Sequence, residues 1–252
     1  MKPTVAIIQA RMTSTRLPGK VLMPLAGRPM LAWQLERVKR ATRLDRIVVA
    51  TTTNACDDAI VEFCRTEGVL VTRGPEDDVL TRYADAARKF DAATVVRLTS
   101  DCPLMDPALI DEAVNRFATA QPGCDYLSNM LEPSFPYGLA VEVMTADALL
   151  QASTEAHDPQ EREHVTPFIY WRPQRFRLQS FTTTPSLSHH RWTVDTPEDF
   201  ELVSRIISAL YPQHPHFTVQ DVLELLQRYP QWVKINAHVE QKSVSPGSQE
   251  NA

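Results

Sequence analysis

The chain has 252 residues, of which 43% are hydrophobic and 23% are charged, and its net charge is −5. This length suffices for one large α/β domain or two small ones, each with a buried core. The acidic balance argues against nucleic acid or an anionic membrane surface as the main partner. No apolar run approaches the roughly 18 residues of a membrane span, and no signal-peptide core follows Met1. The four cysteines show neither a CxxC pair nor dense spacing, so we expect reduced thiols and a cytoplasmic protein.

Strands and helices are predicted to alternate over the first 120 residues. The predicted strands are short, apolar and β-branched, and they span residues 4–10, 45–51, 69–71 and 94–98. The predicted helices carry apolar residues at helical spacing, and they span residues 30–40, 57–67, 78–90 and 107–118. This alternation indicates βαβ units and a mostly parallel sheet, which is an α/β fold.

The middle of the chain differs from the first 120 residues in its composition and in the length of its predicted elements. Residues 122–184 contain shorter elements, several prolines and several aromatic residues. We interpret residues 122–190, approximately, as an acceptor-binding and dimer-forming region that belongs to the same domain. Residues 191–194 then predict a strand that returns to the sheet and ends at Asp195.

The last third of the chain predicts two helices and a tail. Thr196 is suited to cap the first helix, with Pro197 at its first position and Asp199 at its third. Residues 218–229 predict the second helix. The expected domain therefore spans residues 1–240, and residues 241–252, rich in Ser, Gln, Pro and Gly, are expected to be disordered.

A basic loop follows the first predicted strand, at the place where open parallel sheets bind ligands. It brings Arg11, Arg16 and Lys20 within ten positions, with hydroxyl side chains, including Ser14, between them. Such cations, hydroxyls and loop amides can neutralise and orient the phosphates of a nucleoside triphosphate. The pattern is neither a P-loop nor a dinucleotide fingerprint. A solvated basic loop has the same composition, so charge alone leaves both interpretations open.

Two aspartates each follow a predicted strand. Asp101 comes after residues 94–98 and precedes Cys102 and Pro103, and Asp195 comes after residues 191–194. Carboxylates at neighbouring strand ends can hold Mg²⁺ against phosphate oxygens. Each aspartate could equally cap the turn or helix that follows it.

Two further charged clusters have alternative interpretations. Residues 161–166 mix acids, an arginine and His164, which suits either a polar acceptor or a solvated helix start with an internal ion pair. Asp77 and Asp78 precede a predicted helix, where acids are favoured. We prefer that helix-terminal role to a metal-binding one.

Several segments together resemble one family. The opening segment at residues 9–22 resembles the signature of the cytidylyltransferase family, in the branch of the spore-coat polysaccharide biosynthesis protein F. That family is related to the synthetases of CMP-3-deoxy-manno-octulosonate and CMP-acylneuraminate. The resemblance continues through residues 49–54, 73–80, 98–104, 125–129, 137–142, 162–166 and 193–199.

The resemblance implies a single three-layer domain of the nucleotide-diphospho-sugar transferase type, paired as a homodimer. Its implied substrates are CTP and a small acidic acceptor, its metal is Mg²⁺, and pyrophosphate is released. The implied catalytic residues are Arg11, Lys20, Asp101 and Asp195, of which the two aspartates bind the metal. The triphosphate, ribose and base would be contacted by Ala10, Arg11, Ser14, Arg16, Lys20, Ala50, Thr51 and Thr99. The acceptor side would be lined by Tyr137, Glu142, Glu163 and His164.

Two other functions remain as alternatives. A nucleotide-sugar-dependent glycosyltransferase could use a similar sheet, but these enzymes typically carry Asp-x-Asp, and here Cys102 and Pro103 follow Asp101. A non-catalytic nucleotide-binding pathway partner is the second alternative. The presence of both the cations and the aspartates favours an enzyme.

Overall fold

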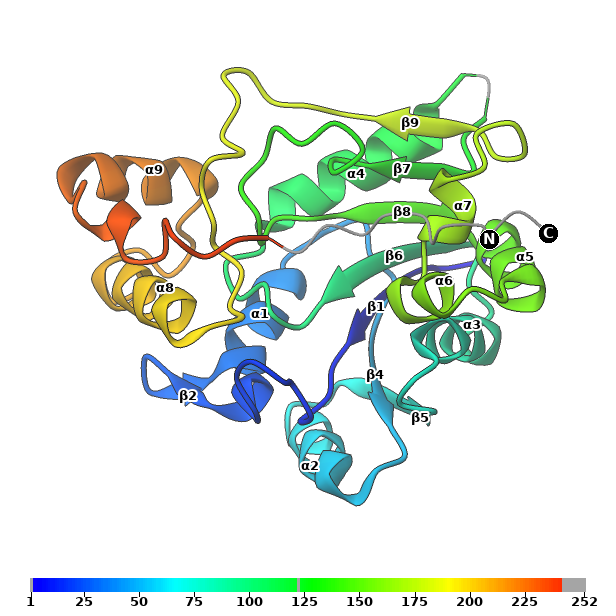
Figure 1. Ribbon diagram of the computed structural model, residues 1–252, viewed down its shortest axis with the longest axis horizontal. Helices are drawn as coiled ribbons and strands as arrows, with labels where there is room; N and C mark the ends of the chain where they lie inside the picture. Colours follow the sequence, from blue (N-terminus) through cyan, green and yellow to red (C-terminus); the bar gives the residue numbers. More distant parts are fainter. Residues whose placement is uncertain (1, 122, 242–252) are drawn as a thin grey trace.

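The fold is built around one sheet of seven strands, seen in Figure 1. The computed structural model describes residues 2–121 and 123–241. The strand order is β5-β4-β1-β6-β8-β7-β9, and β8 pairs antiparallel with both of its neighbours, whereas the other pairs are parallel. The predicted mostly parallel α/β sheet is therefore confirmed. The strands are β1 Thr4–Gln9, β4 Arg46–Thr52, β5 Leu70–Gly74, β6 Thr94–Thr99, β7 Tyr126–Ser128, β8 Glu142–Thr145 and β9 Leu178–Ser180.

Helices cover both faces of this sheet, because its central strands are apolar on both sides. In β1, Val5 and Ile7 pack on one face and Ala6 and Ile8 on the other, and all four are fully buried. The face of Ala6 and Ile8 is covered by α1 Met30–Val38, α2 Asp58–Thr66, α4 Pro107–Thr119, α8 Pro197–Leu210 and α9 Val219–Arg228. The opposite face is covered by α3 Val79–Lys89, α5 Ala146–Glu155 and α7 Pro167–Tyr170, with α6 Pro159–His164 against α3.

The remaining elements are short. A small hairpin pairs β2 Pro24–Leu25 with β3 Arg28–Pro29, and three single 3₁₀ turns are η1 Lys20–Leu22, η2 Ala55–Asp57 and η3 Trp232–Lys234. The strands β7, β8 and β9 join the same sheet as β1, so the region around residues 122–190 extends the first half rather than standing apart. Of the tail predicted at residues 241–252, residues 242–252 lie outside the described residues.

The predicted return strand at residues 191–194 is wrong. Only an isolated bridge between Tyr137 and Arg191 forms there. The amides of Trp192 and Thr193 both donate to the Tyr137 carbonyl, at 2.6 and 3.0 Å, and the Val194 amide donates to the Asp101 carbonyl at 2.8 Å. These hydrogen bonds go to two loops instead of a neighbouring strand, so the apolar segment is buried without becoming part of the sheet.

The order of the strands creates a switch point beside β1, the position at which open parallel sheets form their ligand crevice. From β1 the chain forms β4 and β5 on one side, then returns to form β6 on the other side. The two strands end together, with Gln9 opposite Thr99. In open parallel sheets, ligands bind at such a switch point beyond the carboxyl ends of the strands. The basic loop after β1 and Asp101 after β6 both begin at this point.

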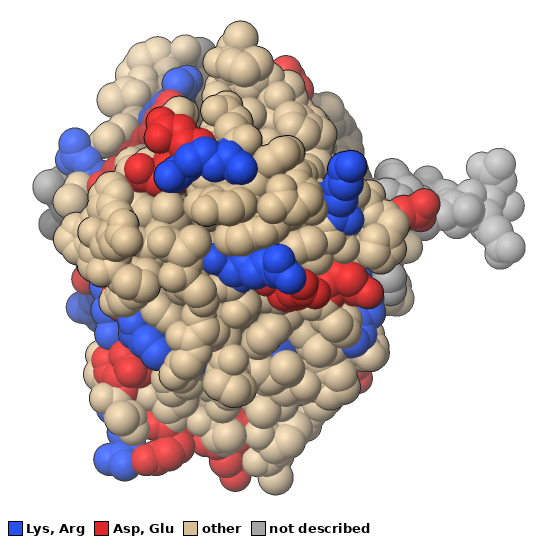
Figure 2. Space-filling view, turned by 90° about the vertical axis from the view of Figure 1, so that its left-hand side faces the viewer, with Lys and Arg blue, Asp and Glu red and all other residues tan. Residues whose placement is uncertain are grey.

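Figure 2 shows the side of the molecule that lies at the left of Figure 1, where α8 and α9 are found. Its charged side chains are scattered among uncharged ones, and acidic groups lie next to several of the basic ones. Among the described residues, this side presents no broad basic surface of the kind that binds a polyanion. Within residues 2–121 and 123–241, no helix has both the length and the apolar character needed to cross a bilayer.

Gly138 makes possible the close packing of the loop before β8. Its φ is 103°, a conformation that favours glycine. A Cβ atom there would lie 2.4 Å from the Thr193 nitrogen and 2.5 Å from the Trp192 carbonyl carbon. Both are backbone atoms and cannot rotate away. Gly27 also has a positive φ, 83°, but nothing lies within 4 Å of its added Cβ.

We predict that Gly138→Ala lowers the free energy of unfolding much more than Gly27→Ala. The Gly27 variant carries only the left-handed backbone cost of about 1–2 kcal/mol. The Gly138 variant must also separate two backbone segments, so its loss should exceed about 4 kcal/mol. Urea denaturation of the two proteins measures the difference. Equal losses would contradict the close approach of the two loops.

Candidate functional site

Lys20 occupies the centre of a charged cluster at the crevice. Gly19, with φ 72°, closes the basic loop through a hydrogen bond from its amide to the Met12 carbonyl, at 2.8 Å, and directs Lys20 inward. The Lys20 side chain is 9% exposed. Its ammonium donates to the Val194 carbonyl at 2.7 Å, to Asp195 Oδ1 at 2.8 Å and to Asp101 Oδ2 at 3.4 Å. The Lys20 ammonium thus joins the loop after β1 to two other segments: the one that follows β6 and the one that precedes α8.

Asp195 is held by cations from two parts of the chain. In addition to Lys20 on Oδ1, its Oδ2 lies 2.9 Å from Arg16 Nη2 and 2.9 Å from Arg191 Nη2. Burial alone would raise the pKa of Asp195, but the charges of Lys20, Arg16 and Arg191 hold that pKa below its usual range. Burial would likewise lower the pKa of Lys20, yet Asp101 and Asp195 raise it. Both groups are therefore charged at neutral pH.

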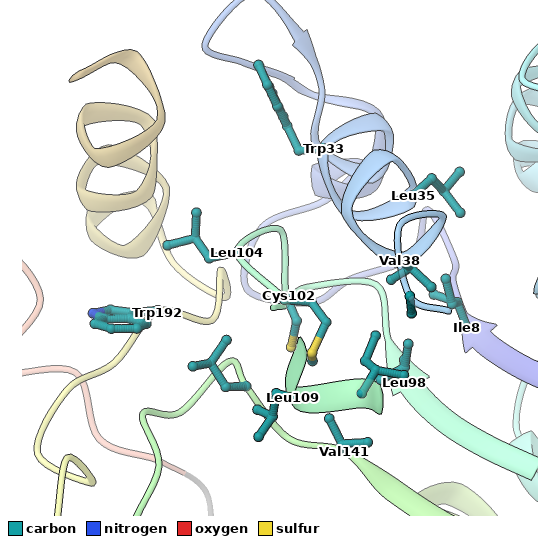
Figure 3. Packing of buried hydrophobic residues seen from close by; sticks show 14 of the residues in the cluster. Ile8, Trp33, Leu35, Val38, Leu98, Cys102, Leu104, Leu109, Val141 and Trp192 are labelled. Carbon is teal, nitrogen blue, oxygen red and sulfur yellow. The ribbon is translucent and has the colours of Figure 1, made fainter. Parts of the chain in front are cut away.

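Asp101 is fixed by its neighbours in sequence. Its Oδ1 accepts a hydrogen bond from Thr99 Oγ1 at 2.6 Å. The next residue, Cys102, points into the core near Leu98 and Leu109, as Figure 3 shows. Trp192, three residues before Asp195, belongs to the same core cluster. The two aspartates therefore lie beside residues anchored in one hydrophobic core, which sets their mutual position.

Cys102 itself is not suited to be a nucleophile. Burial raises the pKa of its thiol well above the usual range. The thiolate is the reactive form of cysteine, and this environment disfavours it.

Arg11 does not join the cluster around Lys20. Its Nη1 lies 3.5 Å from Glu76 Oε1, in the loop between β5 and α3. Glu76 also accepts hydrogen bonds from Thr13 and Asn54. The cations of the basic loop are thus divided: Arg16 and Lys20 turn toward Asp195, and Arg11 turns toward Glu76, after β5.

The residues predicted to contact the nucleotide near the ends of β1 and β4 have mostly buried or internally bonded side chains, so they present mainly backbone groups. The Ala10 amide donates to the Ala50 carbonyl at 3.2 Å, and both side chains are buried. Thr51 is buried and donates its hydroxyl to Asp57 Oδ2 at 3.1 Å. Ser14 Oγ accepts from the Leu17 amide at 3.4 Å and stabilises the loop's own turn. Of the residues predicted near the base and ribose, only Thr99 touches the charged cluster, through Asp101.

This chain is similar to known proteins along most of its length. The profile of the cytidylyltransferase family matches residues 5–228.

The chain belongs to the cytidylyltransferase family.

The spore coat polysaccharide biosynthesis protein SpsF of Bacillus subtilis is 35% identical over 241 residues, which is 91% of this chain and 96% of SpsF. A solved cytidylyltransferase from Leptospira borgpetersenii superposes with a TM-score of 0.88 and 32% identity, covering 97% of this chain and 100% of the other. The 3-deoxy-manno-octulosonate cytidylyltransferase of Trichlorobacter lovleyi is 40% identical over 113 residues, 45% of this chain and 44% of that protein. The predicted family, fold type and enzyme class, a nucleotidyltransferase, are thereby confirmed.

In this cytidylyltransferase, the residues predicted on the acceptor side form two groups. Glu142 is buried, pairs with Arg97, and accepts hydrogen bonds from the Tyr126 hydroxyl at 2.5 Å and from Thr166 Oγ1 at 2.8 Å. His164 lies near this pair; burial lowers its pKa, which favours neutral imidazole at neutral pH. Glu163, adjacent to it, is exposed.

Tyr137 forms the other group. It lines a cavity of about 170 Å³ together with residues 188–192 and parts of the C-terminal segment, and neither Glu142 nor His164 lines that cavity. The structure therefore does not bring Tyr137 into the environment of Glu142.

Sequence reasoning missed Arg191 as a site residue and gave Asp199 only a helix-terminal position. The sequence predicted a strand that includes Arg191. A charged residue next to an apolar, buried run needs a buried partner for its side chain, and that was the signal for a site role. Asp199 does take part in the capping box of α8 with Thr196, as its position in the helix indicates. Because the capping role accounts for an aspartate at this position, nothing in the sequence indicated that Asp199 also contacts Arg191.

The cluster at residues 161–166 makes a long-range contact instead of an internal ion pair. Arg162 Nη2 lies 2.6 Å from Asp78 Oδ2 and so joins α6 to α3. Asp78 also caps α3 by accepting from the Thr81 amide at 3.0 Å, which confirms the predicted helix-terminal role for this residue. Burial would raise the pKa of Asp78, but the hydrogen bonds from Arg162 and Thr81 hold it below its ordinary value of 3.8.

We predict that Asp78→Asn lowers the free energy of unfolding by about 1–2 kcal/mol at pH 7. Because the folded-state pKa of Asp78 is depressed, its stabilisation is present above its ordinary value of 3.8 and is lost as the pH falls through the folded value. The difference between wild type and variant should therefore close below pH 4, approximately, in urea denaturation. Asp85→Asn, on the exposed side of α3, is the matched control. A difference that persists unchanged at low pH would contradict this pairing.

Proposed function

We propose that this chain transfers CMP from CTP to a small acidic sugar or related acceptor, with release of pyrophosphate, in surface polysaccharide biosynthesis. The observation that carries the proposal is the Lys20 ammonium bracketed by Asp101 and Asp195 at the switch point of a cytidylyltransferase sheet. Similarity to SpsF supports the polysaccharide context, and partial similarity to a 3-deoxy-manno-octulosonate cytidylyltransferase supports an acidic acceptor.

The phosphate side uses the basic loop. A nucleoside triphosphate carries roughly four negative charges, enough to compete with Asp195 for Arg16 and Lys20. Arg16 is the more available of the two, with 34% of its side chain exposed against 9% for Lys20. Arg11 binds from the other side of β1, where Glu76 now holds it. The ribose and base then lie over Ala10, Ser14, Ala50, Thr51 and Thr99, where amides and carbonyls provide the polar contacts.

Mg²⁺ fits the two aspartates. Among residues 2–121 and 123–241, no group of three or more His, Cys, Asp or Glu gathers to hold a metal. A protein cage is not required, since Mg²⁺ is usually bound by one or two carboxylates with phosphate oxygens and waters. Asp101 and Asp195 suit this arrangement because both already reach a single cation, Lys20. When bound there, the ion would neutralise charge on the transferring phosphate.

The reaction needs little covalent chemistry from the protein. An acceptor oxygen attacks the α-phosphorus, the new P–O bond forms, and the bond to the β-phosphate oxygen breaks to release pyrophosphate. Lys20 and Arg11 balance negative charge on the α-phosphate and the leaving group. Glu163 and His164 contact the acceptor, whereas Glu142 orients Arg97 beside it. Tyr137 would contact the acceptor only through the separate cavity that it lines with residues 188–192.

We extend the proposal to a homodimer and a cytoplasmic location. The homodimer rests on the family resemblance, and sedimentation velocity tests it. The location is supported by the four cysteines, all of which are free in the structure, as expected in a reducing compartment.

A pyrophosphate-release screen of four nucleoside triphosphates against acidic sugars, including 3-deoxy-manno-octulosonate, tests the function. We expect turnover only when CTP, an acceptor and Mg²⁺ are all present. Release of a nucleoside diphosphate from a nucleotide sugar would instead indicate a glycosyltransferase. Nucleotide binding without any turnover across the panel would favour a non-catalytic partner.

We predict that Asp101→Asn lowers kcat for pyrophosphate release by about 1,000-fold, because loss of a metal carboxylate removes several kcal/mol of charge stabilisation. The protein should stay folded, since Asp101 lies at the edge of the crevice and 25% of its side chain is exposed. Asp147→Asn, on the exposed first turn of α5, is the control and should keep wild-type kcat. A kcat for Asp101→Asn within tenfold of wild type would refute the metal assignment.

A further inference from the structure

Asp199 is the fully buried anchor of the segment that carries Asp195. It is the third residue of α8, and none of its surface is exposed. Its Oδ2 accepts from the amides of Asp195 and Thr196, at 3.0 and 3.2 Å. The backbone that presents the Asp195 side chain is therefore tied to the first turn of this helix.

Arg191 connects this anchor to the Asp195 side chain. Its Nε donates to Asp199 Oδ1 at 2.9 Å and its Nη2 to Asp199 Oδ2 at 3.0 Å, which is a two-point contact. The same Nη2 donates to Asp195 Oδ2 at 2.9 Å. Only 7% of the Arg191 side chain is exposed. The guanidinium thus spans two carboxylates in a fixed plane.

Asn236 completes the arrangement from the end of the chain. Its Nδ2 donates to Asp199 Oδ1 at 2.8 Å and to the Arg191 carbonyl at 2.9 Å. Asn236 is buried, and it lies beyond residue 228, where the match to the family profile ends. The segment after α9 therefore supports the site although the family match does not include it.

The two oxygens of Asp195 consequently have different roles. Arg16 and Arg191 both contact Oδ2, but Arg16 is one-third exposed and can move to a phosphate, whereas Arg191 is buried and tied to Asp199. Arg191 therefore keeps Oδ2 occupied when a ligand arrives. Oδ1 instead contacts the Lys20 ammonium, which also contacts Asp101 Oδ2.

We propose that Arg191, supported by Asp199 and Asn236, is a positioning residue that holds the Asp195 carboxylate, through its Oδ2, in the orientation in which it would bind the divalent cation. This inference rests on the proposed function, because it assumes that Asp195 is a metal ligand. A buried ion pair can also serve stability alone. The two roles differ in the metal affinity of a folded variant. If Arg191 only stabilises the fold, a folded Arg191 variant keeps the wild-type metal affinity.

The test is Mn²⁺ binding to the full-length protein with CTP present and no acceptor, followed by the loss of the free-ion signal in electron paramagnetic resonance beyond the loss that the same CTP causes without protein, because CTP alone also binds Mn²⁺. Arg191→Lys keeps the charge but cannot reach both aspartates in one plane. We expect its Mn²⁺ dissociation constant to rise about 10- to 100-fold, as for other partners that orient metal ligands. Asn236→Ala should shift it in the same direction by a smaller factor.

The matched control is Arg205→Lys, on the exposed face of α8, which should bind Mn²⁺ as wild type does. Wild-type Mn²⁺ affinity in both Arg191→Lys and Asn236→Ala would overturn the inference. If Arg191→Lys does not fold, Asn236→Ala decides alone, and unchanged affinity there has the same meaning. A wild-type protein that binds no Mn²⁺ with CTP and releases no pyrophosphate would instead count against the proposed function.

Discussion

The structure of the site depends on one constraint: the buried charge of Asp195 must be neutralised. A carboxylate that is largely removed from water is costly unless cations and hydrogen bonds surround it. The fold provides Arg16 and Lys20 from the loop after the first strand and Arg191 from far along the chain. These contacts join the loop after β1 to the segment that precedes α8, near the other end of the chain. The site therefore forms only when the N-terminal and C-terminal parts of the chain have folded together.

The charges of the cluster balance before any ligand binds. Arg16, Lys20 and Arg191 face Asp101, Asp195 and Asp199, three positive groups against three negative ones. A triphosphate that draws Arg16 and Lys20 away would leave the carboxylates uncompensated. Under the proposed function, a divalent cation held by Asp101 and Asp195 would replace the positive charge that these carboxylates lose. Nucleotide and metal would then favour each other's binding through the same pair of carboxylates.

The sequence predicted the elements whose signals are local. The apolar character of β1 and β6, the periodicity of α3 and the cap at Thr196 each depend on nearby residues, and all were predicted. The segment at residues 191–194 was misread because its amides bond to loops around Tyr137 and Asp101, which no local pattern indicates. The path of the basic loop was likewise hidden, so nothing separated Arg11 from Lys20 before their partners were known.

Glu142 shows why a predicted site residue could not be given its partner from the sequence. Glu142 and Arg97 meet because β8 pairs antiparallel with β6 in the register that places them opposite each other, and periodicity does not fix a register between distant strands. Arg97 Nη2 also donates to Gln9 Oε1 at 3.2 Å, next to the start of the basic loop. A single strand, β6, therefore carries a cation of the proposed acceptor side and, two residues beyond its end, an aspartate proposed to bind the metal. Under the proposed function, a change in the partner of Arg97 would alter acceptor recognition and leave Lys20 and the two aspartates in place, so that one phosphate site could be combined with different acceptors.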